Sequence, residues 1–240
     1  MRERLLDRLP VFAGLTLLAL AIGLGSFAIA DGIRNRNQND VISVTGSARQ
    51  QIESDYVIWN VSVSSQRATA AQAAKELTAW ANRLRSFLRD AGAQDGEITV
   101  RPISSEPVQD DQGEIVGRRL TRSFEVRSSR VEAIAGIAEK ASALLAQNIP
   151  IEAQAPQYVY TKLASLRPGL IAEATKDALG RAEVLVEATD SDLGSLRSVN
   201  VGVFQVTAPN STDVSDYGVY DTSTLLKDVT AVVNVSFAVK

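Results

Sequence analysis

One polar stretch near the C-terminal end of the chain places carboxylates beside tyrosine rings. The stretch reads TDVSDYGVYD and covers residues 212–221. Carboxylates next to exposed aromatic rings can bind sugars, cations or partner chains. The alternative is a surface loop that covers one end of a sheet and binds nothing. The side chains that could form a partner or ligand loop here are Asp213, Asp216, Tyr217, Tyr220 and Asp221.

A second group of carboxylates could in principle hold Ca²⁺. Asp110, Asp111 and Glu114 lie within VQDDQGEIVG, around Gly113. They lack the ligand spacing and the twelfth-position Glu of an EF-hand loop. Asp and Gly between two extended segments are typical of a solvated hairpin tip. We therefore predict a hairpin tip at this position and no metal site.

Cysteine and histidine are both absent from the chain. Their absence excludes disulfides, thiolate nucleophiles, imidazole metal ligands and the Ser-His-Asp triad. A Ser-Lys site needs a lysine desolvated against a serine, and the sequence contains no S-x-x-K arrangement. We therefore expect no catalytic residue, no cofactor and no enzymatic activity.

The charges do not suggest a nucleic-acid partner. The net charge is −3, and the 25 basic residues are spread along the chain. Proteins that bind a phosphate backbone gather their basic residues into a patch or stripe. We expect no nucleic acid among the partners.

Residues 11–30, VFAGLTLLALAIGLGSFAIA, contain no charged side chain. As a helix, this length spans a hydrocarbon core of about 30 Å. Arginines within residues 1–10 favour a cytoplasmic N-terminus and export of the rest. The alternative is a cleaved signal peptide, since Ala28-Ile29-Ala30 has the form of a cleavage site. We predict a transmembrane anchor over 11–30, a polar linker over 31–40 and a folded domain over 41–240.

The periodicity of apolar residues places helices and strands along the exported part. Spacings of three and four predict three helices, at residues 69–91, 130–147 and 165–189. Alternation predicts the strands, at residues 41–48, 55–65, 97–106, 117–127, 149–161, 196–207 and 227–239. This order predicts an α+β fold: a mostly antiparallel sheet with three long helices packed on it, preceded by one N-terminal transmembrane helix.

Some residues have an expected place within these elements. Thr69 is a suitable N-cap for the first helix, and Gly92 is suited to end it. In the third helix, Pro168 is expected in the first turn, where its missing N–H is tolerated. The packing face of that helix is expected to let it approach its sheet closely, and it consists of Ala174, Ala178, Ala182 and Leu185. Trp59 and Trp80 lie on apolar stripes and are expected in the core.

Several short motifs, taken in order, resemble one protein family. Val44-Thr45-Gly46 lies in the first strand, and Ala91-Gly92-Ala93 follows the first helix. Glu97-Ile98-Thr99 opens a later strand, and AEATKDALGRAEVL precedes the D-L-G-S-L run at 192–196. Together these resemble the SIMPL-domain proteins of bacteria over residues 41–240.

The resemblance implies an α+β fold, export to the periplasm or cell surface, and self-assembly into oligomers. It implies no catalytic residues, and it suggests a link to stress tolerance. With the apolar segment, it leads us to expect a single-pass inner-membrane protein whose domain lies in the periplasm. Cleavage of the segment would instead release the domain into the periplasm.

Three functions remain open on the sequence alone. The first is a structural or interaction protein that associates with copies of itself through strand edges or helix faces. The second is a binding module in which the loop 208–225 holds a small molecule or an envelope component. The third is an enzyme of unknown type, which would need a pocket with a strongly perturbed carboxylate or lysine.

Overall fold

The computed structural model describes residues 40–240, which divide into two compact units. Unit 2 comprises Arg49–Leu170 and Val203–Ala231. The described residues of unit 1 are 40–48, 171–202 and 232–240. The predicted cytoplasmic segment 1–10, the anchor 11–30 and the linker up to residue 39 lie outside the described residues.

Between residues 40 and 240, no helix has both the length and the apolar character needed to cross a membrane.

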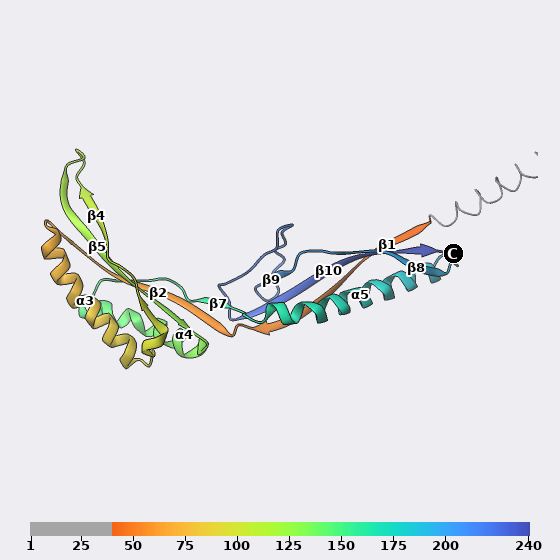
Figure 1. Ribbon diagram of the computed structural model, residues 1–240, viewed down its shortest axis with the longest axis horizontal. Coiled ribbons are helices and arrows are strands. Elements are labelled where there is room, and N and C mark those ends of the chain that lie inside the picture. Colours follow the sequence, from red (N-terminus) through yellow and green to blue (C-terminus); the bar gives the residue numbers. More distant parts are fainter. Residues whose placement is uncertain (1–39) are drawn as a thin grey trace, which may run out of the picture. The chain divides into compact units, whose positions relative to one another are not determined.

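Unit 2 is built on a six-stranded antiparallel sheet with the order β3-β5-β2-β6. Strand β4 adds to β5, and β7 adds to β2. Helices α3 (Ala70–Asp90) and α4 (Val131–Lys140) pack against β2 and β5 (Figure 1). The strands are β2 (Tyr56–Arg67), β3 (Ile98–Val100), β4 (Ser104–Gln109), β5 (Ile115–Ser128), β6 (Ile151–Ala153) and β7 (Gln157–Val159).

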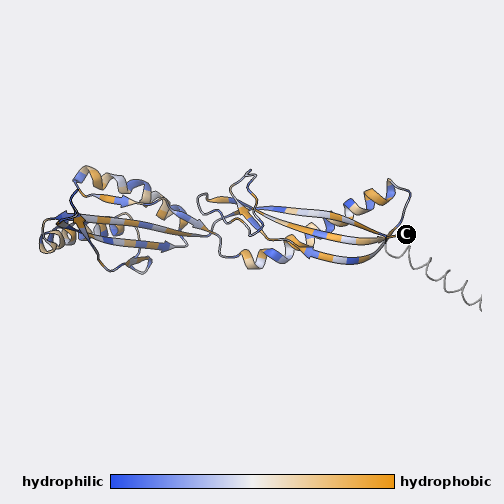
Figure 2. Ribbon diagram, turned by 90° about the horizontal axis from the view of Figure 1, so that it is seen from above, coloured by the Kyte–Doolittle hydropathy of each residue, from blue (hydrophilic) through white to orange (hydrophobic). Residues whose placement is uncertain are grey.

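The core of unit 2 follows the predicted alternation of β2. Val57, Trp59, Val61 and Val63 are buried, while the residues between them are partly exposed. Their partners from β5 include Phe124 and Val126, and the helices add Leu77, Leu84, Leu88, Ile134 and Ile137. Trp80 packs against this cluster from a partly buried position. Figure 2 shows the resulting alternation of hydropathy along the strands.

Both predicted ends of α3 are confirmed. The hydroxyl of Thr69 accepts a hydrogen bond from the backbone N–H of Gln72 at 3.3 Å. Gly92 has a φ of +107°, which a residue with a side chain rarely adopts.

The helix predicted over 130–147 is only partly right. Helix α4 ends at Lys140, and the 3₁₀ helix η3 (Ala141–Gln147) continues the chain to Asn148, whose φ is 57°. In a 3₁₀ helix, residues i and i+3 lie on one face. This tighter winding buries both Ala141 and Leu144 against the core.

A second sheet has the order β1-β10-β8, and β9 adds to β10; unit 1 contributes β8 and parts of β1 and β10 to this sheet. Its strands are β1 (Val41–Glu53), β8 (Leu193–Val201), β9 (Gln205–Thr207) and β10 (Leu226–Val239). Strands β8 and β10 are antiparallel, with Asn200 opposite Asn234. The last part of α5 (Leu163–Glu187) runs along this sheet (Figure 1). The described fold is therefore α+β, mostly antiparallel and with three α-helices, as predicted, but its strands form two sheets where one was expected.

Helix α5 buries every fourth residue: Leu170, Ala174, Ala178, Ala182 and Val186. The three alanines were predicted on this face, but Leu185 was not placed correctly, because the four-residue spacing continues to Val186. Leu185 is exposed. The close approach is confirmed at Gly46, where an added Cβ would lie 2.1 Å from the carbonyl oxygen of Ala174.

Pro168 lies deeper in α5 than predicted, because the helix begins at Leu163. It lacks the N–H that would bond to the carbonyl of Ala164.

Three of the predicted strands are interrupted. The strand expected over 149–161 is divided into β6 and β7 at residues 154–156. The strand expected over 97–106 is divided into the 3₁₀ turn η2 (Asp95–Glu97), β3 and β4. Strand β3 ends at Val100. The N–H of Arg101 still bonds to the carbonyl of Ser123 at 2.9 Å, but Pro102 has no N–H to continue the ladder. The strand expected over 196–207 is divided into β8 and β9 at residues 202–204, and it begins earlier, at Leu193.

Candidate functional site

The predicted ligand loop, residues 208–225, is fastened to unit 2 at its C-terminal end by Asp221. This carboxylate accepts hydrogen bonds from the backbone N–H groups of Ser223 and Thr224, both at 3.1 Å, and from the side-chain hydroxyls of the same two residues. It also pairs at 2.9 Å with the Nζ atom of Lys227, whose side chain is completely buried. Burial opposes ionisation of Asp221, but these hydrogen bonds hold its pKa well below the usual range.

Tyr220 fastens the same end of the loop. Its hydroxyl accepts from the backbone N–H of Tyr160 at 3.0 Å and donates to the carbonyl of Tyr160 at 3.1 Å. The other three predicted side chains are exposed: Asp213, Asp216 and Tyr217, the last of them 97% exposed. The structure therefore does not gather the five residues around one ligand position. The sequence signal for the anchoring role is Lys227, a lone cation at the start of an apolar strand.

The hairpin tip at Asp110 has the geometry expected of a turn. The Oδ1 atom of Asp110 accepts from the backbone N–H groups of Gln112 and Glu114, both at 3.0 Å. Among residues 40–240, no group of three or more acidic side chains is placed to hold a metal ion.

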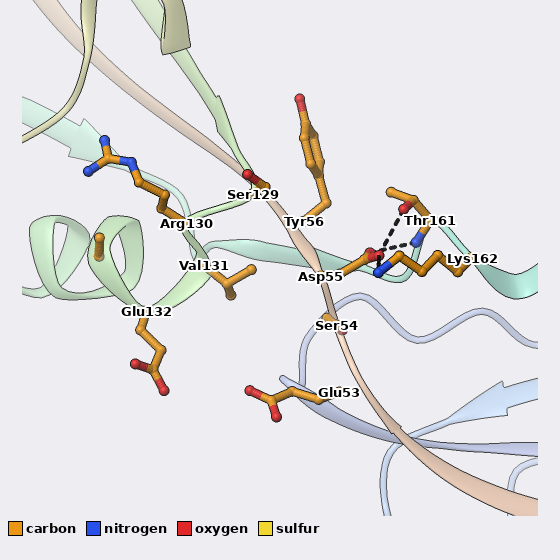
Figure 3. Close-up of a pocket in the computed structure, with 11 residues that line it drawn as sticks. Glu53, Ser54, Asp55, Tyr56, Ser129, Arg130, Val131, Glu132, Thr161 and Lys162 are labelled. Atoms are coloured by element: carbon orange, nitrogen blue, oxygen red, sulfur yellow. Dashed lines mark hydrogen bonds and ion pairs between the residues drawn. The ribbon is translucent and has the colours of Figure 1, made fainter.

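Sequence reasoning did not identify a cleft of about 740 Å³ in unit 2. Three segments line it: the link from β1 to β2, the start of α4, and the turn that precedes α5 (Figure 3). Its polar side chains come from residues far apart in sequence, so no single motif could have indicated it. They are those of Glu53, Ser54, Asp55, Tyr56, Ser129, Arg130, Glu132, Thr161 and Lys162.

Both cations of this cleft are already paired. The Nζ atom of Lys162 lies 3.6 Å from Asp55, which also accepts from the N–H and the hydroxyl of Thr161 at 2.7 and 2.9 Å. Burial opposes ionisation of Asp55, but the bonds from Thr161 and the charge of Lys162 hold its pKa below the ordinary value. Arg130 pairs with Glu97 at 2.5 Å.

The Glu97 carboxylate is strongly stabilised in its ionised form. Hydrogen bonds from Arg130 are the main cause, and those from Ser128 and the backbone N–H of Gln94 add to them against the effect of burial. Together they lower the pKa of Glu97 to about 2. Because Arg130 also donates to the carbonyl of Gly92 at 3.0 Å, this group fixes the end of α3 to the start of α4.

Two carboxylates of the cleft, those of Glu53 and Glu132, reach toward one another in Figure 3. Neither forms an ion pair with another described residue. Beside them, the side chain of Ser54 is 3% exposed, and its Oγ atom has no hydrogen-bond partner among residues 40–240. A serine nucleophile needs a base bonded to its hydroxyl. No such base is bonded to the Ser54 hydroxyl among residues 40–240, and the unpaired charge of the cleft is negative.

The strand β8 is the most exposed structural feature of unit 1. It is an edge strand of its sheet and pairs only with β10 among the described strands. Leu196, Val199 and Val201 are 55%, 44% and 41% exposed. Within the described chain, nothing pairs with its second edge, so its outward N–H and C=O groups remain open to another strand.

The sheet of unit 1 has one apolar face and one polar face. Val44, Val233 and Val235 are buried, and α5 approaches this sheet closely at Gly46. On the opposite face the hydroxyls of Ser43 and Ser236 hydrogen bond at 2.8 Å. On the same side the amide of Asn234 donates to the hydroxyl of Thr45 at 3.4 Å.

Comparison with known families gives one match that covers most of the chain. The model of the family described as "SIMPL: Protein of unknown function (DUF541)" matches residues 42–237. No curated protein sequence matches the chain significantly.

The similarities to solved structures are weak. A putative amidohydrolase/peptidase from Burkholderia cenocepacia matches at 12% identity and a TM-score of 0.20, over 48% of this chain and 31% of that one. The chain thus spans about a third of that protein's length. An uncharacterized conserved protein from Listeria innocua matches at 12% identity and a TM-score of 0.19, over 80% of this chain and 92% of that one. At these scores neither structure bears on the function of this chain.

Proposed function

Because this chain belongs to the SIMPL family, whose function is unknown, we propose its role from its own surfaces. We propose that it is a membrane-anchored interaction protein without enzymatic activity, which faces the periplasm and assembles with copies of itself. The observation that carries this proposal is the open edge of β8 with its exposed aliphatic side chains. Envelope stress tolerance is the setting that the family resemblance suggests.

An unprotected strand edge favours a partner strand. Soluble proteins usually protect an edge with charged side chains, proline or a covering segment. In β8, LGSLRSVNV, the only charged residue is Arg197 and there is no proline. A second β8 placed antiparallel to the first would satisfy the open backbone groups and cover Leu196, Val199 and Val201. The strand is thus self-complementary, as a two-fold interface requires.

The predicted anchor supports the same proposal. If residues 11–30 hold each copy in a bilayer, all copies face the same side and move in two dimensions. Their effective concentration then rises far above that of free chains, so a weak edge contact is sufficient for assembly.

The side chains in the cleft of unit 2 support the proposal that the protein has no enzymatic activity. The cations of the cleft, Lys162 and Arg130, are held in ion pairs, and no base among residues 40–240 is hydrogen bonded to the Ser54 hydroxyl. These groups fix the backbone rather than leave a nucleophile ready for attack.

The test replaces one aliphatic side chain of the edge with a charge. In the detergent-solubilised full chain, Val199→Lys should shift the mass measured by light scattering from an oligomer to a monomer, because two lysines would face each other across the joined edges. Val184→Lys is the matched control, since Val184 is 64% exposed on α5 and lies off the edge. A monomeric wild type, or an oligomer unchanged by Val199→Lys, would contradict the proposal.

A second candidate function is partner binding through the loop 208–225. Val214 is 81% exposed and Tyr217 97% exposed, three positions apart in one segment. Replacing both with serine should remove an envelope component that copurifies with the wild type, without changing the melting temperature. Identical copurifying components in the wild type and the double variant would count against this function.

A further inference from the structure

We propose that a second cavity in unit 2 binds a small organic carboxylate with an apolar body. The cavity measures about 200 Å³ and lies between α3, β5 and the segment that joins β3 to β4. It is separate from the 740 Å³ cleft, because the two share no lining residue. The proposal does not depend on self-assembly.

The periodicities of the helix and the strand explain why the residues that line the cavity share common faces. Leu77, Ala81 and Arg85 recur every four residues and therefore share one side of α3. Arg122 and Phe124, two residues apart on β5, point to the same face of the sheet. These two elements pack against each other in the core of unit 2 (Figure 1).

The floor and rim of the cavity are apolar. Leu77 and Phe124 form the floor and are almost completely buried. Val100 and Ile103 line the rim, and they remain 38% and 41% exposed. Large aliphatic side chains beside a hollow lose water contact when an apolar ligand body fills it, which favours binding.

The charge of the cavity is positive. Arg85 and Arg122 line it, and no lining residue is acidic. Neither arginine forms an ion pair with another residue of the described chain. The Nη1 atom of Arg122 donates to the carbonyl of Arg101 at 3.2 Å, which leaves other N–H donors of its guanidinium for a ligand.

A cavity lined by two arginines and by apolar side chains is complementary to an anion attached to an apolar body. Guanidinium binds a carboxylate through two parallel hydrogen bonds. At about 30 Å³ for a water-sized group, the cavity holds roughly seven such groups. That volume suits an aromatic or short-chain carboxylate and is too small for a nucleotide or a complete lipid.

Benzoate and hexanoate are suitable probes, with benzamide as the uncharged analogue of benzoate. The full chain in nanodiscs is titrated by calorimetry, and empty nanodiscs correct for partition into lipid. We expect saturable binding of at least one carboxylate with a Kd of about 1 mM or tighter. We also expect roughly tenfold weaker binding of benzamide than of benzoate, because the charged hydrogen bonds are lost. Tighter binding of benzoate than of hexanoate would mark the ligand as aromatic, and the reverse order as aliphatic.

Two variants locate the site. Arg85→Gln and Arg122→Gln should each weaken carboxylate binding about tenfold. Arg83→Gln, on the same helix but not in the lining, should leave it unchanged. Melting temperatures of the variants check that each is folded. The proposal is overturned if benzoate and benzamide bind equally, if no carboxylate saturates, or if both folded cavity variants bind like the wild type.

Discussion

In both units a helix packs against an antiparallel sheet, but the side chains at the contact differ in size. In unit 2, large side chains fill the space between layers, among them Trp59, Phe124 and Leu84. In unit 1, the contact between α5 and β1 is made by Ala174, Ala178 and Gly46, so the backbones come close together. One unit thus has a thick core and the other a thin one.

The difference shows what each unit needs for stability. Burial of apolar area stabilises a fold by roughly 25 cal/mol per Å², and alanine contributes little area. Unit 2 buries its large aliphatic and aromatic side chains internally. Unit 1 leaves Leu196, Val199 and Val201 of β8 exposed. A thin core next to an exposed apolar edge is consistent with a unit that gains stability by covering that edge with a second copy.

The largest expected effect comes from a matched pair of leucines, one in each unit. Leu84 in α3 is completely buried, whereas Leu179 in α5 is 37% exposed. Leu84→Ala should reduce the free energy of unfolding of unit 2 by about 3 kcal/mol, because it leaves a cavity in the core. Leu179→Ala should cost less than about 1 kcal/mol. Urea titration of both variants measures the difference, and equal losses would remove the contrast between the cores.

A side chain at Gly46 should affect unit 1 selectively. Gly46→Val would push into the backbone of α5 and should destabilise unit 1 by about 2 kcal/mol. Hydrogen exchange should speed up in the part of α5 after Ile171. The fluorescence of Trp59 and Trp80, both in unit 2, should keep its unfolding midpoint.

The control for this prediction is Gly136→Ala in α4. An added Cβ at Gly136 meets nothing within 4 Å, so helix propensity should make this variant neutral or slightly more stable. If Gly46→Val behaves like the control, the close packing of α5 does not hold unit 1 together.

The smallest effect concerns acid. The pKa of Glu97 is lowered from an ordinary 4.5 to about 2, so its ion pair with Arg130 stabilises unit 2 fully above pH 4.5. That contribution falls as the pH drops from 4.5 toward 2, and solvent screening limits it to about 1 kcal/mol. Glu97→Gln should therefore lower the melting temperature at pH 7 and lose less stability between pH 4.5 and 3 than the wild type. If the stability of both proteins falls by the same amount between pH 4.5 and 3, the ion pair of Glu97 with Arg130 does not stabilise unit 2.

Local patterns in the sequence were sufficient for the type and approximate position of most elements and for most of their buried faces. The alternation in β2 identified Val57, Trp59, Val61 and Val63 as core, and Thr69 and Gly92 marked the ends of α3 correctly. Such signals depend on residues two to four positions apart, which the sequence displays directly.

The candidate sites could not be predicted from such local patterns. The loop 212–221 showed its polar residues, but the roles of Tyr220 and Asp221 depend on Tyr160 and Lys227, which only the folded chain brings to them. The cleft and the cavity each join side chains from three segments of unit 2. Periodicity within one segment carries no information about which segments meet.

By itself, then, the sequence determined the class of fold, most of the apolar stripe of each helix and the family. The tertiary structure decided where strands break, which edge stays open and which charges remain unpaired. The physical reason is that residues in contact can be far apart along the sequence. The hydroxyls of Ser43 and Ser236, for example, lie 2.8 Å apart although 193 positions separate them in the chain. Contacts of that kind result from the packing of whole elements, and no window of neighbouring residues specifies them.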